Sequence, residues 1–215
     1  MHIGLGTVKV NGKIVTEMGF QVNPGDDVRF DGQRITSDKP TYVLLNKPKG
    51  FLASIKKGNY KKDVLELVGN AVPFRIDPMF AMDRSSTGLL LFSNDVAMQD
   101  KLRKPSLRVK KIYQVVLDKN CTKEAQAKLK KGIRIDKKVI AAEEVSFIQG
   151  ETKRVVGVEL HDQTYKAVQQ LFSALDYTVE NIDLVAFGHL TKKDLPRGRW
   201  RHLSEHEVNL LKMLK

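Results

Sequence analysis

The stretch "FAMDRSSTGLLLFSND" (residues 80–95) joins a polar loop to a strongly apolar run. The run at 89–92 predicts a buried strand, because a short apolar segment bounded by turn residues is typical of one. A single carboxylate, Asp83, precedes the run within an Arg-Ser-Ser-Thr-Gly loop. An aspartate before a turn usually bonds only to nearby backbone amides. The stretch therefore predicts a strand entered through a polar loop and leaves the role of Asp83 open.

Strands and helices follow one another around this stretch without a regular strand–helix–strand alternation. Strands are predicted at residues 41–47, 111–117, 143–149, 155–161 and 179–187. Helices are predicted at residues 64–68, 95–102, 122–132, 165–175 and from 204 onward, the last opened by a Ser-x-x-Glu capping box. We therefore expect an α+β fold with a mixed, largely antiparallel sheet and flanking helices.

The first forty residues have a different pattern, with two hairpin signals at Asn11-Gly12 and Asp31-Gly32 between alternating apolar and polar residues. A β-rich piece this small would need a helix or two to cover its apolar face. We interpret residues 1–38 as a shortened module and residues 39–215 as a second domain.

Composition points to a polyanionic partner. The 215 residues include 37 Lys and Arg against 25 Asp and Glu, a formal charge of +12. Cations that neutralise phosphates release counterions and so favour nucleic acid, whereas the alternative is a solubilising lysine coat. Cys121 is the only cysteine, so no internal disulfide is possible and a reducing cytoplasm is expected. No apolar run is long enough to cross a bilayer, so we expect no membrane contact.

Several enzyme classes are disfavoured by the motifs that the chain lacks. The five histidines show no paired spacing with cysteines or carboxylates, so no metal site is expected. Neither a Walker loop nor a nucleophile elbow occurs. The chain is thus expected to work without a cofactor or a metal.

Three stretches, "NKPKG" (46–50), "MDRSSTGLLLFSND" (82–95) and "KKIYQV" (110–115), resemble in order and spacing the pseudouridine synthases that modify ribosomal RNA. The tail "LTKKDLPRGRWRHLSEHEVNLL" (190–211) is similar to the ending of the branch that modifies small- and large-subunit stem-loops. The β-rich start resembles the second half of the RNA-binding module that precedes this catalytic domain, a module named after a small-subunit ribosomal protein.

The resemblance implies a pseudouridine synthase-like fold and the isomerisation of a uridine in ribosomal RNA to pseudouridine, without a cofactor. It assigns Asp83 as the catalytic carboxylate and Tyr113 as the tyrosine that packs on the flipped base. Expected substrate-binding positions are Lys47, Arg84, Lys111, Lys166 and Leu184. Expected RNA-binding residues are Lys56, Lys57, Lys192, Lys193, Arg197, Arg199 and Arg201. We expect the protein to act as a monomer.

The chain departs from the family pattern where arginines are usual. Ala81 replaces one, the segment "TYKAVQQ" (164–170) keeps only Lys166 as a cation, and Leu184 stands where another arginine is expected. Family members pair one such arginine with the catalytic carboxylate. Two main readings stay open: a working synthase, and a catalytically weakened or inactive RNA-binding relative that acts in ribosome assembly. The net charge argues against a third, a fold relative with an unrelated small substrate.

Overall fold

The computed structural model describes residues 3–22, 26–34, 39–55, 58, 60–104, 107–135, 138–161 and 164–214. The chain divides into two compact units, Met1–Lys39 and Pro40–Lys215. Within the described ranges, no helix is long and apolar enough to cross a membrane.

The first unit is a small antiparallel sheet with a short 3-10 helix, η1 (Ile3–Leu5). Its strands run in the order β2 (Lys13–Ile14), β1 (Val8–Val10), β3 (Val28–Phe30) and β4 (Gln33–Arg34). Both predicted hairpin turns have positive φ at their two central residues, 50° and 80° at Asn11-Gly12 and 50° and 79° at Asp31-Gly32, as the tight turns that match strand twist require. Among its described residues only Val10 is buried.

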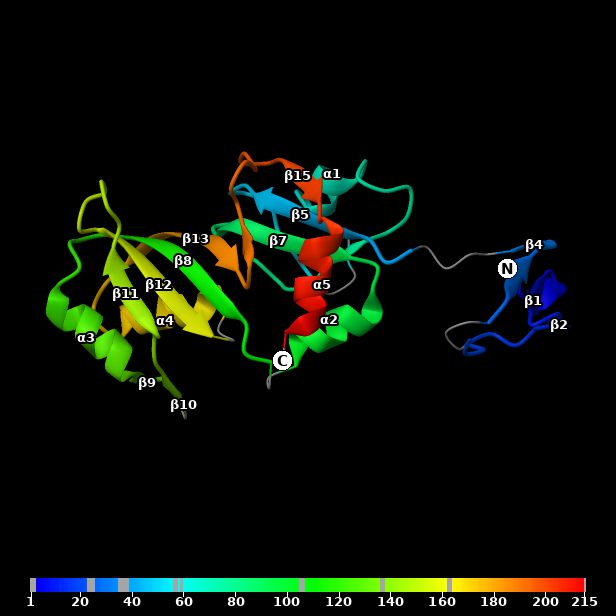
Figure 1. Ribbon diagram of the computed structural model, residues 1–215, viewed down its shortest axis with the longest axis horizontal. Helices are drawn as coiled ribbons and strands as arrows, with labels where there is room; N and C mark the ends of the chain where they lie inside the picture. Colours follow the sequence, from blue (N-terminus) through cyan, green and yellow to red (C-terminus); the bar gives the residue numbers. More distant parts are fainter. Residues whose placement is uncertain are drawn as a thin grey trace. The chain divides into compact units, whose positions relative to one another are not determined.

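The second unit is built on a nine-stranded sheet (Figure 1). The main path of the sheet is β11 (Glu144–Phe147), β12 (Val155–His161), β8 (Lys110–Leu117), β13 (Val179–Phe187), β7 (Thr87–Ser93), β5 (Tyr42–Lys47) and β15 (Trp200–His202). Two short strands lie off this path, β14 (Leu190–Thr191) against β13 and β6 (Asp77–Pro78) against β7. Among the strands that the structure describes, β7 and β13 are the one parallel pair, so the predicted α+β fold with a largely antiparallel sheet is confirmed.

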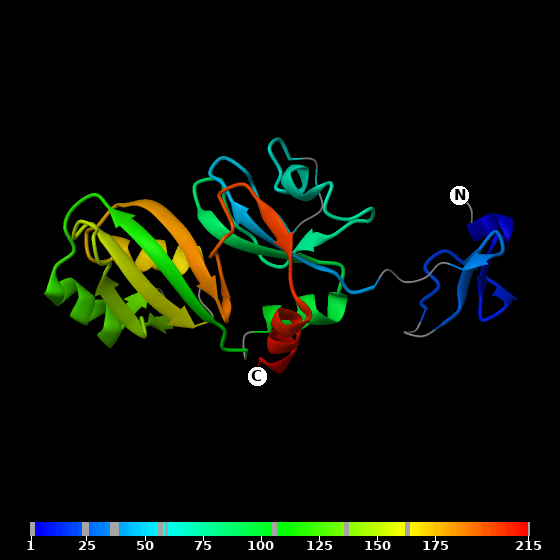
Figure 2. The same cartoon turned by 45° about the horizontal axis from the view of Figure 1, so that its top comes forward.

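A separate two-stranded ribbon, β9 (Ile133–Ile135) with β10 (Lys138–Ile140), follows helix α3 and was not predicted. The helices are α1 (Leu65–Val68), α2 (Val96–Arg103), α3 (Lys123–Lys131), α4 (Tyr165–Ser173) and α5 (Glu205–Met213). Helix α3 packs against β11 and α4 against β13. Helices α2 and α5 lie side by side in both views (Figures 1 and 2), where the Lys101 ammonium donates to the carbonyl of Lys212.

Side-chain caps fix where the helices begin. The Thr122 hydroxyl accepts a hydrogen bond from the amide of Ala125 at 3.1 Å. Ser204 and Glu207 form the predicted capping box at the start of α5. Each cap satisfies backbone donors that have no partner inside the helix.

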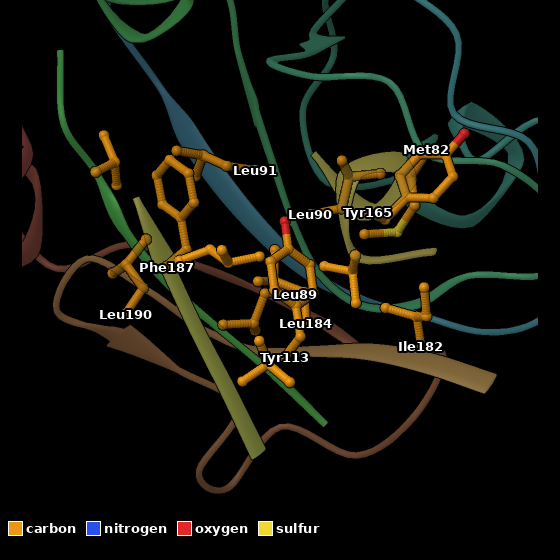
Figure 3. Packing of buried hydrophobic residues seen from close by; sticks show 14 of the residues in the cluster. Met82, Leu89, Leu90, Leu91, Tyr113, Tyr165, Ile182, Leu184, Phe187 and Leu190 are labelled. Atoms are coloured by element: carbon orange, nitrogen blue, oxygen red, sulfur yellow. The ribbon is translucent and has the colours of Figure 1, made fainter. Parts of the chain in front are cut away.

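Strands β5 and β7 form the centre of the core, since every residue of both is buried. Figure 3 shows Leu89 of β7 beside Leu184 of β13, and Leu91 beside Phe187, within the cluster of buried apolar residues. In the parallel pairing, Thr87 faces Asp183 and Gly88 faces Leu184. Gly88 has φ +108°, and a Cβ there would lie 2.3 Å from the carbonyl oxygen of Leu184. Only glycine lets the two strands approach this closely.

Candidate active site

Asp83 lies in the loop that leads into β7, with its carboxylate held by the residues that follow it. Its Oδ1 accepts hydrogen bonds from the amide of Ser86 at 2.7 Å and from the hydroxyl of Ser85 at 3.0 Å. This is the local bonding expected of an aspartate before a turn. Because Asp83 is only half-buried, the loop fixes the carboxylate without enclosing it.

A buried ammonium supports the same loop. Lys47, at the end of β5, has no exposed surface. Its Nζ donates to the carbonyls of Asp83 and Ser86, both at 2.7 Å, and to that of Pro48 at 3.3 Å. Lys47 was expected to bind substrate, whereas the structure places its charged end on backbone carbonyls of the loop. Its position is therefore that of a support for Asp83.

The two charges affect each other's protonation. Burial lowers the pKa of Lys47 to about 8, although the negative charge of Asp83 acts in the opposite direction. Burial also raises the pKa of Asp83, but hydrogen bonds from Ser86 and Ser85 and the charge of Lys47 outweigh it and hold the pKa of this carboxyl below its ordinary value. Asp83 is thus ionised at neutral pH, as a nucleophile or a base must be.

A cavity of about 500 Å³ opens beside this loop. Its apolar and aromatic lining comprises Ile55, Met79, Phe80, Ala81, Met82, Leu102, Leu107, Val109, Tyr113, Tyr165, Leu184 and Phe187. Four cations also line it: Arg103, Lys104, Lys111 and Lys166. Among the described residues that line the cavity, none is acidic. An apolar cavity with a cationic lining suits a planar ring attached to phosphates.

Tyr113 and Leu184 form part of the apolar wall, from paired positions on β8 and β13 (Figure 3). Tyr113 is 3% exposed, and burial raises the pKa of its hydroxyl above the ordinary tyrosine value. Lys111, two residues earlier on β8, has its Nζ 5.8 Å from the centre of the Phe187 ring. The fold therefore brings four expected site residues that lie far apart in the sequence to one cavity: Lys111, Tyr113, Lys166 and Leu184.

Comparison with known proteins shows the family of this chain. Residues 41–192, which include Asp83, Tyr113 and Lys166, match the sequence pattern of the RNA pseudouridylate synthase family. The chain belongs to the RNA pseudouridylate synthase family. The resemblance drawn from the sequence is thereby confirmed.

Curated relatives of this synthase-family chain align along nearly its whole length. It is 30% identical to the ribosomal large subunit pseudouridine synthase B of Bacillus subtilis (strain 168), over 97% of this chain and 86% of that protein. It is 26% identical to the ribosomal small subunit pseudouridine synthase A of Escherichia coli (strain K12), over 94% of this chain and 87% of that protein. A crystal structure of a pseudouridylate synthase has the same fold, with a TM-score of 0.73 at 22% identity, covering 98% of this chain and 90% of that chain.

Tyr165 is a site residue that sequence reasoning missed in this family member. It is the first residue of α4, lines the cavity and is 9% exposed. Burial, the negative charge of Asp83 and a hydrogen bond to that carboxylate raise the pKa of the Tyr165 hydroxyl. Its place in the segment 164–170, in which arginines were expected from the sequence, was the available signal. A neutral hydroxyl therefore faces Asp83 from the segment in which arginines were expected.

Arg84 follows the catalytic candidate in the chain but bonds elsewhere. Its Nη1 donates to the carbonyl of Lys61 at 2.9 Å and to that of Gly50 at 3.5 Å. The side chain is exposed. Arg84 thus links the Asp83 loop to the segment around residues 50–61.

The predicted RNA-binding cations divide into two groups. Lys192 and Arg197 are paired with the buried Asp183, and Arg201 pairs with Glu207 at 2.6 Å. Lys193 and Arg199 are exposed. The remaining two, Lys56 and Lys57, lie outside the described residues. In the part of the chain that the structure describes, no three His, Cys, Asp or Glu side chains gather as a metal ligand set.

Proposed function

We propose that this protein isomerises a uridine of ribosomal RNA to pseudouridine, with Asp83 as the catalytic carboxylate. The observation that carries the proposal is an ionised carboxylate that Ser85 and Ser86 hold by hydrogen bonds, in a loop supported by Lys47. Asp83 is not itself among the residues that line the apolar cavity with its cations, but its chain neighbour Met82 and its hydrogen-bond partner Tyr165 both line it. The names of the relatives from B. subtilis and E. coli, synthases of the two ribosomal subunits, support ribosomal RNA as the substrate.

The reaction conserves every atom of the nucleotide. The bond between the ribose C1′ and uracil N1 breaks, the uracil turns, a bond forms between C1′ and C5, and the C5 proton moves to nitrogen. The Asp83 carboxylate can act as a nucleophile toward the nucleotide or as a proton acceptor from the sugar. Both roles need its ionised form.

The cavity supplies what this chemistry needs besides the carboxylate. A uridine must leave its stack to expose the reacting bond, and an extruded base requires an apolar or aromatic surface. Tyr113 and Leu184 provide that surface. Lys111 and Lys166 line the same cavity, where they can neutralise the phosphates on either side of the extruded nucleotide.

Purified protein incubated with unmodified ribosomal RNA tests the proposal. We expect pseudouridine to form at a defined uridine, detected by chemical mapping against a control without protein. Tight, structure-selective RNA binding with no pseudouridine at any position would contradict catalysis. It would favour the RNA-binding relative, for which the neutral Tyr165 beside Asp83 is the supporting observation.

The pH dependence of turnover should reflect the titration of both charged groups of the loop, the Asp83 carboxylate and the Lys47 ammonium. Because the pKa of Asp83 is held below its ordinary value, the rate should persist into the acidic range and fall only as this carboxylate is protonated, below the pH at which an ordinary aspartate titrates. Because the pKa of Lys47 is about 8, the rate should fall above that pH, as the neutral amine has one N–H fewer for its three carbonyls. Single-turnover rates at saturating RNA would measure both limbs. A rate that falls already near pH 6, or one that is constant to pH 9 and beyond, would contradict this assignment.

RNA binding should depend strongly on salt through the exposed cations of the tail. Several phosphate contacts would weaken binding by orders of magnitude between about 50 and 200 mM salt. Replacing Lys193 and Arg199 by glutamine should reduce the slope of log K against log salt by about two. Arg201→Gln should leave the slope nearly unchanged, because Arg201 already pairs with Glu207. A slope that Lys193 and Arg199 do not affect would remove them from the RNA interface.

A further inference from the structure

Arg197 was expected to contact RNA phosphates, but its guanidinium lies on a buried carboxylate. Nη1 is 2.8 Å from Oδ1 of Asp183, and Nη2 is 3.1 Å from Oδ2. The same Nη1 donates to the Asn46 side chain at 2.7 Å and to the carbonyl of Lys47 at 3.2 Å. Asp183 is 4% exposed. A two-pronged pair of this kind fixes orientation as well as charge.

The carboxylate of Asp183 reaches a second strand. Its Oδ1 accepts a hydrogen bond from the hydroxyl of Thr87 at 2.8 Å, and Lys192 pairs with its Oδ2. Thr87 is the first residue of β7 and faces Asp183 in the parallel pairing. The pair of Arg197 and Asp183, here called the clamp, therefore contacts the end of β5 and the start of β7 together.

These two strand ends are the ones that hold the Asp83 loop. On the β5 side the clamp binds the carbonyl of Lys47, whose Nζ donates to the carbonyls of Asp83 and Ser86. On the β7 side it binds Thr87, which follows Ser86, and the Ser86 amide donates to the Asp83 carboxylate at 2.7 Å. The clamp thus contacts one support of the Asp83 loop, Lys47, directly, and it contacts Thr87, the chain neighbour of the other support, Ser86.

We propose that Arg197 is a positioning residue for Asp83, which it orients through Lys47 on one side and through Asp183, Thr87 and Ser86 on the other. The proposal rests on the proposed function of Asp83 as the catalytic carboxylate. A group placed about 1 Å from its productive position can lose on the order of a hundredfold in rate. Loosening the clamp should therefore lower the rate of the chemical step and leave RNA affinity almost unaffected.

The chain offers a matched control in Arg154. Its side chain is 41% exposed, as is that of Arg197, and it pairs with Glu180 at 2.8 Å. Its Nε also donates to a backbone carbonyl, that of Leu117, at 2.7 Å. Arg154→Met removes an arginine–carboxylate ion pair and a hydrogen bond to a backbone carbonyl at the end of β8, away from the residues that hold Asp83. The two carboxylate partners differ in burial, since Glu180 is 49% exposed and Asp183 is 6% exposed.

The test compares Arg197→Met, Arg197→Lys and Arg154→Met with the unmodified protein. We expect Arg197→Met to lower the single-turnover rate at saturating RNA by about ten- to a hundredfold, with a change in RNA Kd of less than about threefold. Arg197→Lys should recover part of the rate, because it restores the charge without the fork. Arg154→Met should leave the rate unchanged, and it should lower the melting temperature less than Arg197→Met does, because Glu180 is half exposed and Asp183 is buried. If Arg197→Met does not fold, Thr87→Val removes a single contact of the clamp and should give a smaller loss in the same direction.

Hydrogen exchange at the Ser86 amide gives a readout that does not depend on activity. This amide donates to the Asp83 carboxylate, so it should exchange faster in Arg197→Met and not in Arg154→Met. Should the unmodified protein form no pseudouridine, the proposed function fails, and the exchange data still decide the clamp. Unchanged exchange at Ser86, equal rate losses in the two methionine variants, or a loss of RNA affinity with an unchanged rate in Arg197→Met would each overturn the proposal.

Discussion

Asp83→Asn is expected to lower the rate of pseudouridine formation by at least about a thousandfold. The amide has the shape of the carboxylate and can still accept the hydrogen bond from the Ser86 amide, which is 2.7 Å long in the structure. It carries no charge and cannot act as a nucleophile or a base. RNA affinity and melting temperature should therefore change little, and a single-turnover assay on a ribosomal RNA fragment would measure the loss.

Asp77 provides the control for this substitution. It is a second aspartate of the same region, on β6, and pairs with Arg75 at 2.9 Å on the surface. Asp77→Asn should keep the full rate, because exposed ion pairs contribute little and neither Asp77 nor Arg75 is among the residues that line the cavity. Full turnover in Asp83→Asn would show that Asp83 is only a turn residue.

Gly88→Ala is expected to destabilise the fold by on the order of 4 kcal/mol. A Cβ at this position would lie 2.3 Å from the carbonyl oxygen and 2.4 Å from the amide nitrogen of Leu184, and 2.8 Å from Oδ1 of Asp183. All three neighbours are backbone atoms or a buried, paired carboxylate, so none can move cheaply. Strands β7 and β13 would have to separate, and the positive φ would add its own strain.

Gly150→Ala separates the two contributions. Gly150 also has positive φ, +84°, but a Cβ there would meet nothing within 4 Å. Gly150→Ala should therefore destabilise the fold only through the positive φ, by about 1 to 2 kcal/mol. Chemical denaturation of both variants would measure the difference. If both variants lost the same free energy of unfolding, the close approach of β7 to β13 would not be the reason for glycine at position 88.

The main elements could be predicted because their sequence patterns are local. The apolar run at 89–92 and the alternating residues at 111–117 correspond to β7 and β8, and the capping box at Ser204 marks the start of α5. Strands β14 and β15 were not predicted. They have two and three residues, too few to show a period of two.

The site was predicted only in part, because partners far apart in the sequence leave no pattern. Asp83 and Tyr113 came from the family resemblance. Tyr113 lines the cavity, whereas Asp83 lies next in the chain to Met82, which lines it. The tail "RGRWR" (197–201) has three arginines at alternate positions that look equivalent. In the fold Arg197 pairs with the buried Asp183, Arg201 pairs with Glu207, and Arg199 is exposed. The tertiary fold decides which of these arginines meets a buried carboxylate, and no local pattern in the sequence records it.

Lys47 shows the same limit more sharply. In the sequence it is one of several lysines in a basic chain, and burial of a lysine is rare unless its ammonium is bonded. Its role as a donor to the carbonyls of Asp83 and Ser86 requires β5 to lie beside β7. The pairing of those strands therefore places Lys47, which was expected to contact substrate, against the backbone of the Asp83 loop, and no sequence motif indicates this position.

Mapping pseudouridine in ribosomal RNA from cells that lack this protein tests the central claim most directly. The cells would be complemented with the unmodified protein or with Asp83→Asn, each at the same abundance. We predict that at least one pseudouridine is missing without the protein, returns with the unmodified chain and stays missing with Asp83→Asn. A complete set of pseudouridines without the protein, or restoration by Asp83→Asn, would contradict the assignment of this chain as a ribosomal RNA pseudouridine synthase that works through Asp83.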